Sequence, residues 1–351
     1  MTTKSMQLTA FGHALEERHG EIPTPKGSEV LLKMLGAGVC HSDVHFRSGS
    51  YDMGPGKTLS LTGRVQFPRT LGHEATGVVV ATGPDAADVE IGKTYLINGW
   101  GGCRHCPACL RGDEHLCVAS QFMGLARDGG YAEHIVVAHP RYLVDIGQLD
   151  PIDAAPLACS GLTAYGALTK SPVGLDSTVP IIIGGGGIGL MAVHLVRLLE
   201  GRGAIVIDLD ASKRQAALDA GALAAFDPSE PDLVSRIRAV VDGPVVFVVD
   251  FVGTGKTTEF GFEILDKGGK LVIVGLFGGA MTISIPLIPT KSATIQGSYI
   301  GNGATLRELV ELIKLKGMPS LPIQRRKLSD ADSAMTELEE GRVLGRIVLV
   351  P

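Results

Sequence analysis

Four of the six cysteines of this chain lie within fifteen residues, at the spacing C-x2-C-x2-C-x7-C. They are Cys103, Cys106, Cys109 and Cys117. Four thiolates suit a tetrahedral zinc ion and leave no coordination position for a substrate. A bacterial iron–sulfur motif begins with the same spacing, but its fourth cysteine follows after three residues rather than seven. The pattern therefore predicts a structural zinc that holds a loop in shape, with an iron–sulfur cluster or free thiols as the alternatives.

The other two cysteines, Cys40 and Cys159, lie far apart in the sequence. With His73, in the run LGHE, they offer two thiolates and an imidazole, a ligand set suited to a zinc ion with one open position. Each residue alone is weak evidence, because a lone buried cysteine usually packs as a small hydrophobic side chain. The three residues together are stronger evidence, because four cysteines would then bind one zinc ion, the other two would bind a second, and no cysteine would remain. We therefore expect a second, catalytic zinc.

A dinucleotide-binding unit is predicted in the middle of the chain. A short apolar strand over residues 180–183 precedes Gly184, Gly186 and Gly189, which fill the positions of a G-x-G-x-x-G motif that opens a helix. The next predicted strand ends at Asp208, nineteen positions after Gly189. A carboxylate there binds the adenosine ribose hydroxyls and repels a 2′-phosphate, so NAD is favoured over NADP. The alternative is that Asp208 only caps the following helix.

Further strand–helix units follow, with strands expected over residues 245–250 and 270–274. Alternating units of this kind build a doubly wound parallel sheet. The fold class is therefore predicted as α/β.

Composition limits the classes of function. The 351 residues include 45% apolar and 20% charged residues, as in a folded protein, and the net charge of −5 argues against binding nucleic acid. A nucleic-acid-binding zinc ribbon is disfavoured because it would need basic and aromatic residues around the cysteines, whereas Arg104 and Arg111 lie beside Asp113 and Glu114. The most apolar segment, residues 179–196, is interrupted by glycines, and the first residues lack a secretory pattern. We expect no membrane partner and a cytoplasmic location.

Five motifs occur in one order along the chain: CHSDVH from Cys40, GHE from Gly72, the four-cysteine loop, LACSGLTAYGAL from Leu157 and IIGGGGIG from Ile182. In this order and spacing they resemble the zinc-dependent medium-chain alcohol dehydrogenases over essentially the whole chain. The segment between the first two motifs is similar to that of the bacterial and archaeal tetrameric branch. The resemblance implies a homotetramer, two zinc ions per chain and NAD as cofactor.

The resemblance also implies roles for particular residues. Cys40, His73 and Cys159 would bind the catalytic zinc, with Glu74 adjacent to it and Asp43 orienting the imidazole. Zinc would supply the acidity that an alcohol lacks at neutral pH.

Ser42 would take the alcohol proton and pass it through the nicotinamide ribose to His45, for which a plain surface histidine is the alternative. The remaining contacts to the cofactor are expected from His41, Gly187, Ile188, Lys213, Val274, Tyr299 and Arg346. Of these, His41 and Arg346 would lie near the pyrophosphate and Lys213 near the adenosine ribose.

The substrate pocket should include Phe46, Trp100, Tyr299 and Ile300, beside Ser42. Its aromatic and apolar character predicts medium-length, cyclic or aromatic primary or secondary alcohols, with the matching aldehydes or ketones in the reverse direction. For Trp100, a subunit contact or loop packing is the alternative.

The motifs predict a mostly β, GroES-like catalytic domain over residues 1–156 and 301–351, with a zinc lobe at about residues 98–118. A Rossmann domain would occupy residues 157–300.

Polyol and threonine dehydrogenases of similar architecture have glutamate at the place of Cys159, and zinc-free quinone reductases lack both cysteine sets. A catalytically silent scaffold would be expected to have lost Cys40, Ser42, His73 or Cys159, all of which are present.

Overall fold

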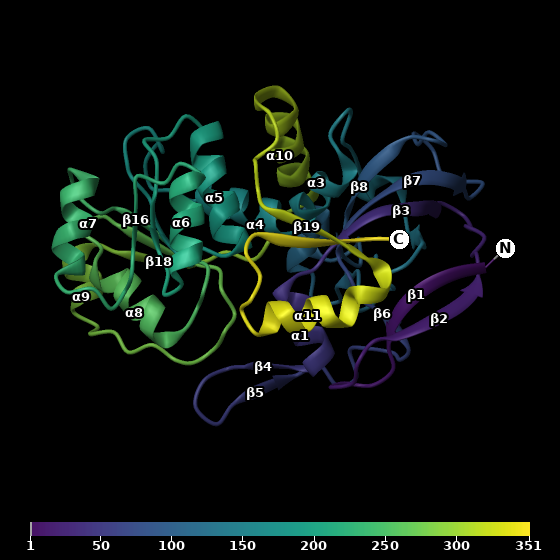
Figure 1. Cartoon of the computed structure of the whole chain (residues 1–351), viewed down its shortest axis with the longest axis horizontal. Coiled ribbons are helices and arrows are strands. Elements are labelled where there is room, and N and C mark those ends of the chain that lie inside the picture. The colour runs from purple at the N-terminus through teal and green to yellow at the C-terminus, as the bar shows by residue number, and fades with distance from the viewer. Residues whose placement is uncertain (1) are drawn as a thin grey trace.

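The computed structural model describes residues 2–351. Two lobes lie side by side in Figure 1, with the helices and strands of the middle of the chain at the left and both chain ends in the right-hand lobe. Helices α4 (Ser160–Leu168) and α10 (Gly303–Lys316) lie between them. Both helices pack against α5 (Gly187–Leu198), so they connect the two lobes.

The left-hand lobe contains a six-stranded sheet, parallel throughout, in the order β15-β14-β13-β16-β17-β18. This is the strand order of a dinucleotide-binding sheet. Its strands are β13 (Ile181–Ile183), β14 (Ile205–Ile207), β15 (Ala224–Phe226), β16 (Phe247–Asp250), β17 (Lys270–Ile273) and β18 (Thr294–Gly297). Its other helices are α6 (Ala211–Asp219), α7 (Leu233–Val241), α8 (Gly255–Glu263) and α9 (Leu287–Lys291).

Alternate residues of these strands belong to different core clusters. Ile182 and Val206 share a core with residues of α5, whereas Ile181 and Ile205 share another with residues of α7 and α8. Side chains on a strand point to opposite faces in turn, so helices cover both faces of this sheet. The sheet is therefore doubly wound, as the sequence predicted.

The right-hand lobe is built on a seven-stranded sheet, mostly antiparallel, in the order β12-β8-β7-β3-β20-β19 with β11 also paired to β3. These strands are β3 (Val30–Gly38), β7 (Glu74–Thr82), β8 (Thr94–Asn98), β11 (His134–Val137), β12 (Leu143–Asp145), β19 (Ile323–Lys327) and β20 (Arg346–Val350). A smaller sheet joins β1 (Thr2–Leu8), β2 (Glu16–Glu21) and β6 (Arg69–Thr70). The last strand of the chain, β20, thus joins the seven-stranded sheet beside β3, a strand of the N-terminal third.

Short elements surround this sheet. The helices and 3-10 turns are α1 (His41–Ser48), α2 (Pro107–Leu110), η1 (Glu114–Leu116), η2 (Pro140–Tyr142), α3 (Pro151–Ala154), η3 (Ala155–Ala158), η4 (Leu328–Asp330) and α11 (Ala331–Glu339). Strands β9 (Trp100–Gly101) and β10 (Gln121–Phe122) pair at the base of the cysteine-rich loop. Strands β4 (Ser50–Asp52) and β5 (Thr58–Ser60) form a hairpin that projects below α1 and α11 in Figure 1.

The glycine turn after β13 needs glycine for two distinct reasons. Gly184 has φ +99°, a conformation that side chains rarely tolerate. A Cβ on Gly189 would lie 1.8 Å from the carbonyl oxygen of Gly184, so only glycine lets α5 approach the strand this closely. The residues of the turn therefore fix where α5 begins.

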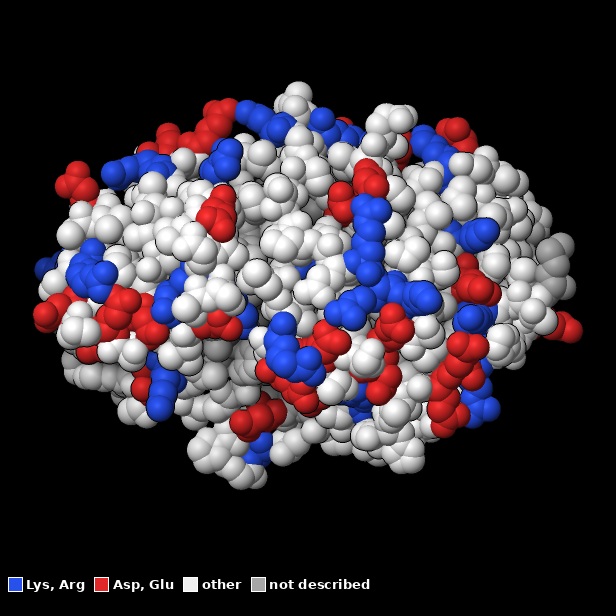
Figure 2. Space-filling view, in the orientation of Figure 1, with Lys and Arg blue, Asp and Glu red and all other residues white. Residues whose placement is uncertain are grey.

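No helix within residues 2–351 is long and apolar enough to cross a membrane. The face in Figure 2 carries lysine and arginine interspersed with aspartate and glutamate, without a broad region of one sign.

Candidate active site

Three distant parts of the chain bring Cys40, His73, Glu74 and Cys159 together in the interior. Each of these side chains offers a ligand atom, and the four atoms lie within 4.8 Å of one another. Cys40 follows β3 and precedes α1, His73 precedes β7, and Cys159 lies between η3 and α4. The structure thus places the predicted catalytic ligands side by side.

The imidazole of His73 is oriented for a metal ion. Its Nδ1 lies 3.1 Å from Oδ1 of Asp43, and both residues are fully buried. Its Nε2 is buried and has no hydrogen-bond partner among residues 2–351. A buried ring nitrogen without a partner is costly, but it is the atom that a metal ion would bind when Nδ1–H donates to a carboxylate. Zinc fits this donor set of two thiols and one imidazole.

Asp43 is held by more donors than the sequence indicated. Its carboxylate accepts the backbone N–H groups of Cys40 at 3.2 Å and Gly72 at 3.1 Å, besides the His73 ring. The hydroxyl of Tyr131 also donates to it, at 3.0 Å. Burial, with the adjacent Asp43 carboxylate, raises the pKa of Tyr131 well above its usual value, so this phenol remains a donor. Tyr131 was missed because nothing in its local sequence indicates that it reaches a residue 88 positions away.

Glu74 lies beside the thiols and joins them to the cofactor lobe. Its Oε2 pairs with the guanidinium of Arg346, and its Oε1 is buried without a partner within residues 2–351. Burial raises the pKa of Glu74 to about 7, although the positive charge of Arg346 opposes that rise. A Cβ on Gly187 would lie 2.5 Å from Cδ of Arg346. Arg346 therefore contacts both Glu74 and the N-terminal end of α5, where a pyrophosphate is expected.

Ser42 and His45 lie on α1 and face the same cavity as Cys40 and Cys159. The cavity has a volume of about 120 Å³. The ring of His45 lies 4.5 Å from that of Tyr51, centroid to centroid. Burial lowers the pKa of His45, so its ring is neutral at neutral pH and can accept a proton. The described residues contain no direct Ser42–His45 hydrogen bond, so a proton passing between them needs an intermediary.

The glycine turn and Asp208, predicted to bind NAD, lie on the other lobe. A Cβ on Gly186 would meet no atom within 4 Å, so the turn is open where a pyrophosphate would approach. Asp208 accepts the N–H of Gly185 at 2.7 Å and that of Asp210 at 2.8 Å. The cap of α6 is Asp210, whose carboxylate accepts the N–H of Lys213 at 3.3 Å, so the alternative of Asp208 as a helix cap is wrong.

His41, Ile188, Val274 and Tyr299 line the cavity that also contains the metal ligands. His41 begins α1, and its ring lies 5.2 Å from that of Phe277, centroid to centroid. Burial lowers the pKa of His41 as well. Residues expected to contact the cofactor and the thiols of Cys40 and Cys159 therefore line one cavity.

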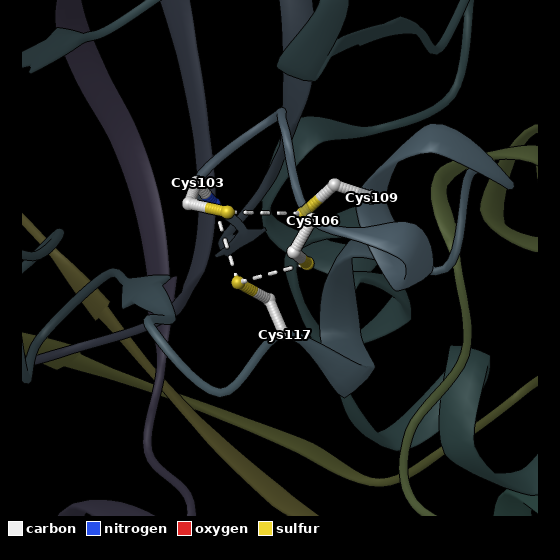
Figure 3. Close-up of side chains that lie close together, drawn as sticks. All are labelled: Cys103, Cys106, Cys109 and Cys117. Atoms are coloured by element: carbon white, nitrogen blue, oxygen red, sulfur yellow. Dashed lines mark hydrogen bonds between the residues drawn. The ribbon is translucent and has the colours of Figure 1, made fainter.

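The four remaining cysteines form a separate cluster (Figure 3). The sulfur atoms of Cys103 and Cys109 lie 3.9 Å apart and those of Cys106 and Cys117 lie 3.8 Å apart. Four thiolates at Zn–S distances of about 2.3 Å in a tetrahedron are separated by about 3.8 Å. These cysteines are free of disulfide bonds, and their spacing fits a zinc ion.

The cysteine-rich loop is anchored to its surroundings by acidic residues. Glu114 accepts the N–H of Gly102 at 2.9 Å and the hydroxyl of Tyr142 at 2.7 Å. Asp113 accepts a hydrogen bond from Asn302, the N-cap of α10, at 3.2 Å. The loop is thereby connected to the chain where it re-enters the right-hand lobe.

Comparisons with known proteins agree with this geometry. Residues 26–148 match the alcohol dehydrogenase GroES-like domain and residues 187–314 match the zinc-binding dehydrogenase domain. An NAD-dependent alcohol dehydrogenase of Sulfurisphaera tokodaii is 36% identical over 99% of this chain and 100% of that protein. The chain belongs to the zinc-dependent medium-chain alcohol dehydrogenase family.

The solved alcohol dehydrogenase of Aeropyrum pernix superposes with a TM-score of 0.87 at 29% identity, covering 99% of this chain and 100% of that one. The predicted fold class, a GroES-like lobe with a Rossmann sheet, is confirmed. A D-arabinose 1-dehydrogenase (NADP(+)) of Saccharolobus solfataricus is 29% identical over 99% of this chain and 98% of that protein. Members of this medium-chain dehydrogenase family thus differ in their named substrates.

In this member of the family, Phe46, Trp100, Tyr299 and Ile300 all line the cavity beside the metal ligands. Trp100 is only 3% exposed, and its Nε1 donates to the carbonyl oxygen of Ala158 at 2.9 Å. Its ring lies 5.0 Å from that of His73. The alternative of Trp100 as a subunit contact is therefore wrong, because its side chain is already covered.

The sequence did not indicate several other residues of this dehydrogenase cavity, because they lie on distant elements and loops that only the fold brings together. They are Tyr51, Thr163, Phe251, Gly275, Leu276, Phe277 and Ser298. Ile300 has φ +52°, which is rare for a β-branched residue and marks a tightly constrained turn at the cavity wall.

A second cavity of about 520 Å³ continues outward from the first. Phe46, Tyr51, Leu276 and Tyr299 line both of them. The outer cavity lies between the β4–β5 hairpin and the loop after β17. In a dehydrogenase of this family it provides a path from solvent to the metal ligands.

Proposed function

We propose that the protein catalyses the reversible NAD-dependent oxidation of primary or secondary alcohols to aldehydes or ketones. The observation that carries this proposal is the buried, unpartnered Nε2 of His73 beside Cys40 and Cys159, two thiols that line a cavity shared with residues expected to bind the cofactor. The alcohol dehydrogenases that the chain resembles along its full length support the same activity.

In this proposal Cys40, His73 and Cys159 hold one zinc ion, Glu74 lies next to it, and the four clustered cysteines hold a second. Bound zinc supplies Lewis-acid polarisation of the substrate oxygen, and NAD supplies the hydride acceptor. Asp43 keeps Nδ1 of His73 protonated, so the lone pair of Nε2 stays available for the metal.

The protein's own acid–base groups move the proton of the alcohol. The hydroxyl of Ser42 faces the cavity and would take the proton, and the neutral ring of His45 would receive it; NAD, when bound, would supply ribose hydroxyl groups for such a relay. A relay is proposed because the inner cavity is small, so it leaves little room for water beside the reacting atoms.

The cofactor is expected to lie along Gly184, Gly186 and Gly189 with its adenosine ribose at Asp208. A negative charge at that place disfavours the additional phosphate of NADP. Lys213 and Arg346 then act at the ribose and pyrophosphate, respectively.

The substrate preference follows from the walls of the inner cavity. Phe46, Trp100, Tyr299 and Ile300 provide aromatic and aliphatic surface. Such a lining favours medium-length, cyclic or aromatic alcohols over ethanol or sugars, because polar hydroxyls would lose hydrogen bonds to water there.

The domain division stays part of the proposal: residues 1–156 and 301–351 as the catalytic part and 157–300 as the cofactor part. The cytoplasmic location and the homotetramer are also part of the proposal.

Support for self-association comes from β18, which lies at the edge of its sheet with no strand on its outer side within residues 2–351. Large apolar side chains in the segment before it that line neither cavity are exposed: Ile285, Leu287 and Ile288. An uncovered edge strand beside apolar surface suits pairing with a second copy of the chain.

The direct test measures NADH formation with primary, secondary, cyclic, benzylic and polyol alcohols, offering NAD or NADP in turn. We expect turnover of benzylic and medium-chain alcohols with NAD, which a zinc chelator abolishes and added zinc restores. No turnover of any alcohol, with the zinc content of the protein verified, would contradict the proposed activity. Comparable rates on ethanol and benzyl alcohol would contradict the proposed substrate preference alone.

A further inference from the structure

The outer cavity has an apolar wall and two charged residues, Asp52 and Arg64. The apolar wall consists largely of Met53, Leu59, Leu61, Phe122, Leu125 and Met281. An alcohol with only a short body would use the inner cavity and leave this surface unused. The outer cavity therefore points to substrates with a longer apolar body and a polar group at its far end.

The two charged residues differ in what already binds them. The carboxylate of Asp52 accepts the N–H of Gly54 at 2.9 Å, and its side chain packs close to Gly278. The side chain of Arg64 forms no ion pair and no hydrogen bond within residues 2–351; its backbone N–H donates to the carbonyl oxygen of Leu61 at 2.9 Å. Neither charge takes part in an ion pair within residues 2–351, but only the guanidinium keeps all of its side-chain donors free, and these suit a carboxylate.

Arg64 lies at the outer end of the path to the metal ligands. It is exposed and lines only the outer cavity, whereas Tyr299 lines both cavities. Burial raises the pKa of the Tyr299 phenol to about 12, and the positive charge of Arg64 acts on it in the opposite direction. The guanidinium is therefore close enough to act on the residue that separates the two cavities.

We propose that the preferred substrates are alcohols whose apolar chain or ring ends in a carboxylate, which Arg64 binds at the mouth of the outer cavity. This inference rests on the proposed function, because it takes the hydroxyl to lie at the metal ligands. The apolar middle of the substrate then covers the apolar wall, and the carboxylate stays at the solvent edge, where its desolvation costs little. A guanidinium offers a carboxylate two parallel charge-assisted hydrogen bonds, and at this solvent edge added salt weakens the pair.

The test compares ω-hydroxy acids of four, six, eight and ten carbons with their uncharged methyl esters. For the length that spans both cavities, kcat/KM with NAD should be about fivefold higher for the acid than for its ester, a preference that falls as salt is added. Acids that are no better than their esters at every length would overturn the inference while leaving the proposed function intact. No turnover of acids, esters or simple alcohols would instead refute the proposed function.

Arg64→Gln should reduce the acid-to-ester ratio to about one, and Arg64→Lys should retain part of it because the charge remains. The matched control is Lys57→Gln, which removes the same charge from the same exposed segment but does not line the cavity. An unchanged ratio in Arg64→Gln, or an equal loss in Lys57→Gln, would refute a role for Arg64.

A binding measurement tests the same contact without turnover. Octanoate, which has no hydroxyl to oxidise, should bind the zinc-loaded protein about fivefold more weakly in Arg64→Gln than in Lys57→Gln. Octanamide should bind both variants equally. Equal affinities of octanoate for the two variants would overturn the inference whether or not any alcohol is oxidised.

Discussion

At the scale of single residues, the least expected feature is the fourth hydrogen bond to Asp43, from Tyr131. Tyr131 is fully buried, and its ring packs so closely on Gly72 that a Cβ there would lie 2.4 Å from it. Gly72 has φ +92°, which a side chain would strain further. The phenol therefore both supports the turn before His73 and fixes the carboxylate that orients its ring.

Tyr131→Phe removes only the hydroxyl and should weaken zinc binding at the Cys40–His73–Cys159 set by about 10- to 100-fold. The reason is that Asp43 loses a donor and holds His73 less firmly. The rate of zinc transfer to a coloured chelator measures this directly, besides kcat/KM. Tyr95→Phe is the control, since Tyr95 is also buried but its hydroxyl meets only the N–H of Glu90, at 3.5 Å. Equal zinc loss in both variants would mean that Tyr131 acts through packing.

The lowered pKa of His45 predicts how the rate of alcohol oxidation depends on pH. Burial lowers its pKa, although the charges of Cys40 and Glu339 act in the other direction. The neutral ring accepts the proton, so kcat/KM should fall as the pH drops through the lowered pKa, below the usual 6.5. Folding stability changes in the same direction: the unfolded chain binds a proton below pH 6.5 that the native ring resists, so stability is lost on acidification through that window.

The pH profile of His45→Gln checks this role. The acidic limb should disappear and the rate at neutral pH should fall by about tenfold, because glutamine holds the position but cannot take the proton. A variant that keeps both the rate and the limb would show that His45 is a plain surface histidine.

At the scale of elements, the cysteine-rich loop acts as an anchor for the right-hand lobe rather than as a reactive site. Glu114 and Asp113 tie it to Tyr142 and to Asn302, the cap of α10. Because Ile300 lines the substrate cavity two residues earlier, the loop also supports the turn at that wall.

Cys106→Ser should leave the protein with one zinc per chain and lower its melting temperature by several degrees, while kcat per folded molecule changes little. Serine lacks the thiolate that completes the tetrahedron, and the metal's binding energy is part of the folding energy. Metal analysis with calorimetry measures both quantities. Ala108→Ser is the control, since it introduces the same side chain between the cysteines without removing a ligand. Retention of both zinc and melting temperature in Cys106→Ser would contradict a structural zinc.

The elements that the sequence predicts well are those with a local signature. The apolar runs around Ile181–Ile183 and Phe247–Asp250 form buried strands, and the glycine turn begins α5, as expected. The cysteines and His73 were also found by residue type, because few other residues suit a soft metal.

The features that could not be predicted are contacts between segments that lie far apart in the sequence. The pairing of Arg346 with Glu74 and the outer cavity formed around the β4–β5 hairpin are of this kind, since neither leaves a pattern in neighbouring residues.

At the scale of the whole molecule, the two lobes share one continuous apolar core through α4, α5 and α10. The other face of the six-stranded sheet has a separate core. The residues expected to bind the cofactor and the metal ligands therefore lie where the two lobes meet. This junction is closed on one side by the apolar core and open to solvent on the other, through the outer cavity. The six-stranded sheet ends at two edge strands, β15 and β18, and exposed apolar side chains precede β18.

The edge at β18 gives a prediction about assembly. The N–H groups of Thr294 and Ser298 bond to the chain on the β17 side, so the N–H of Ile295 points to the open edge. Ile295→Pro should leave the sheet intact, because proline is tolerated where a strand's N–H faces outward. It should nevertheless block pairing with a second copy, so that light scattering gives a mass below that of the proposed homotetramer, four times 36.7 kDa. Ile295→Val, which keeps the N–H and a β-branched side chain, should leave the mass unchanged. A folded Ile295→Pro protein of unaltered mass would mean that subunits meet elsewhere on the surface.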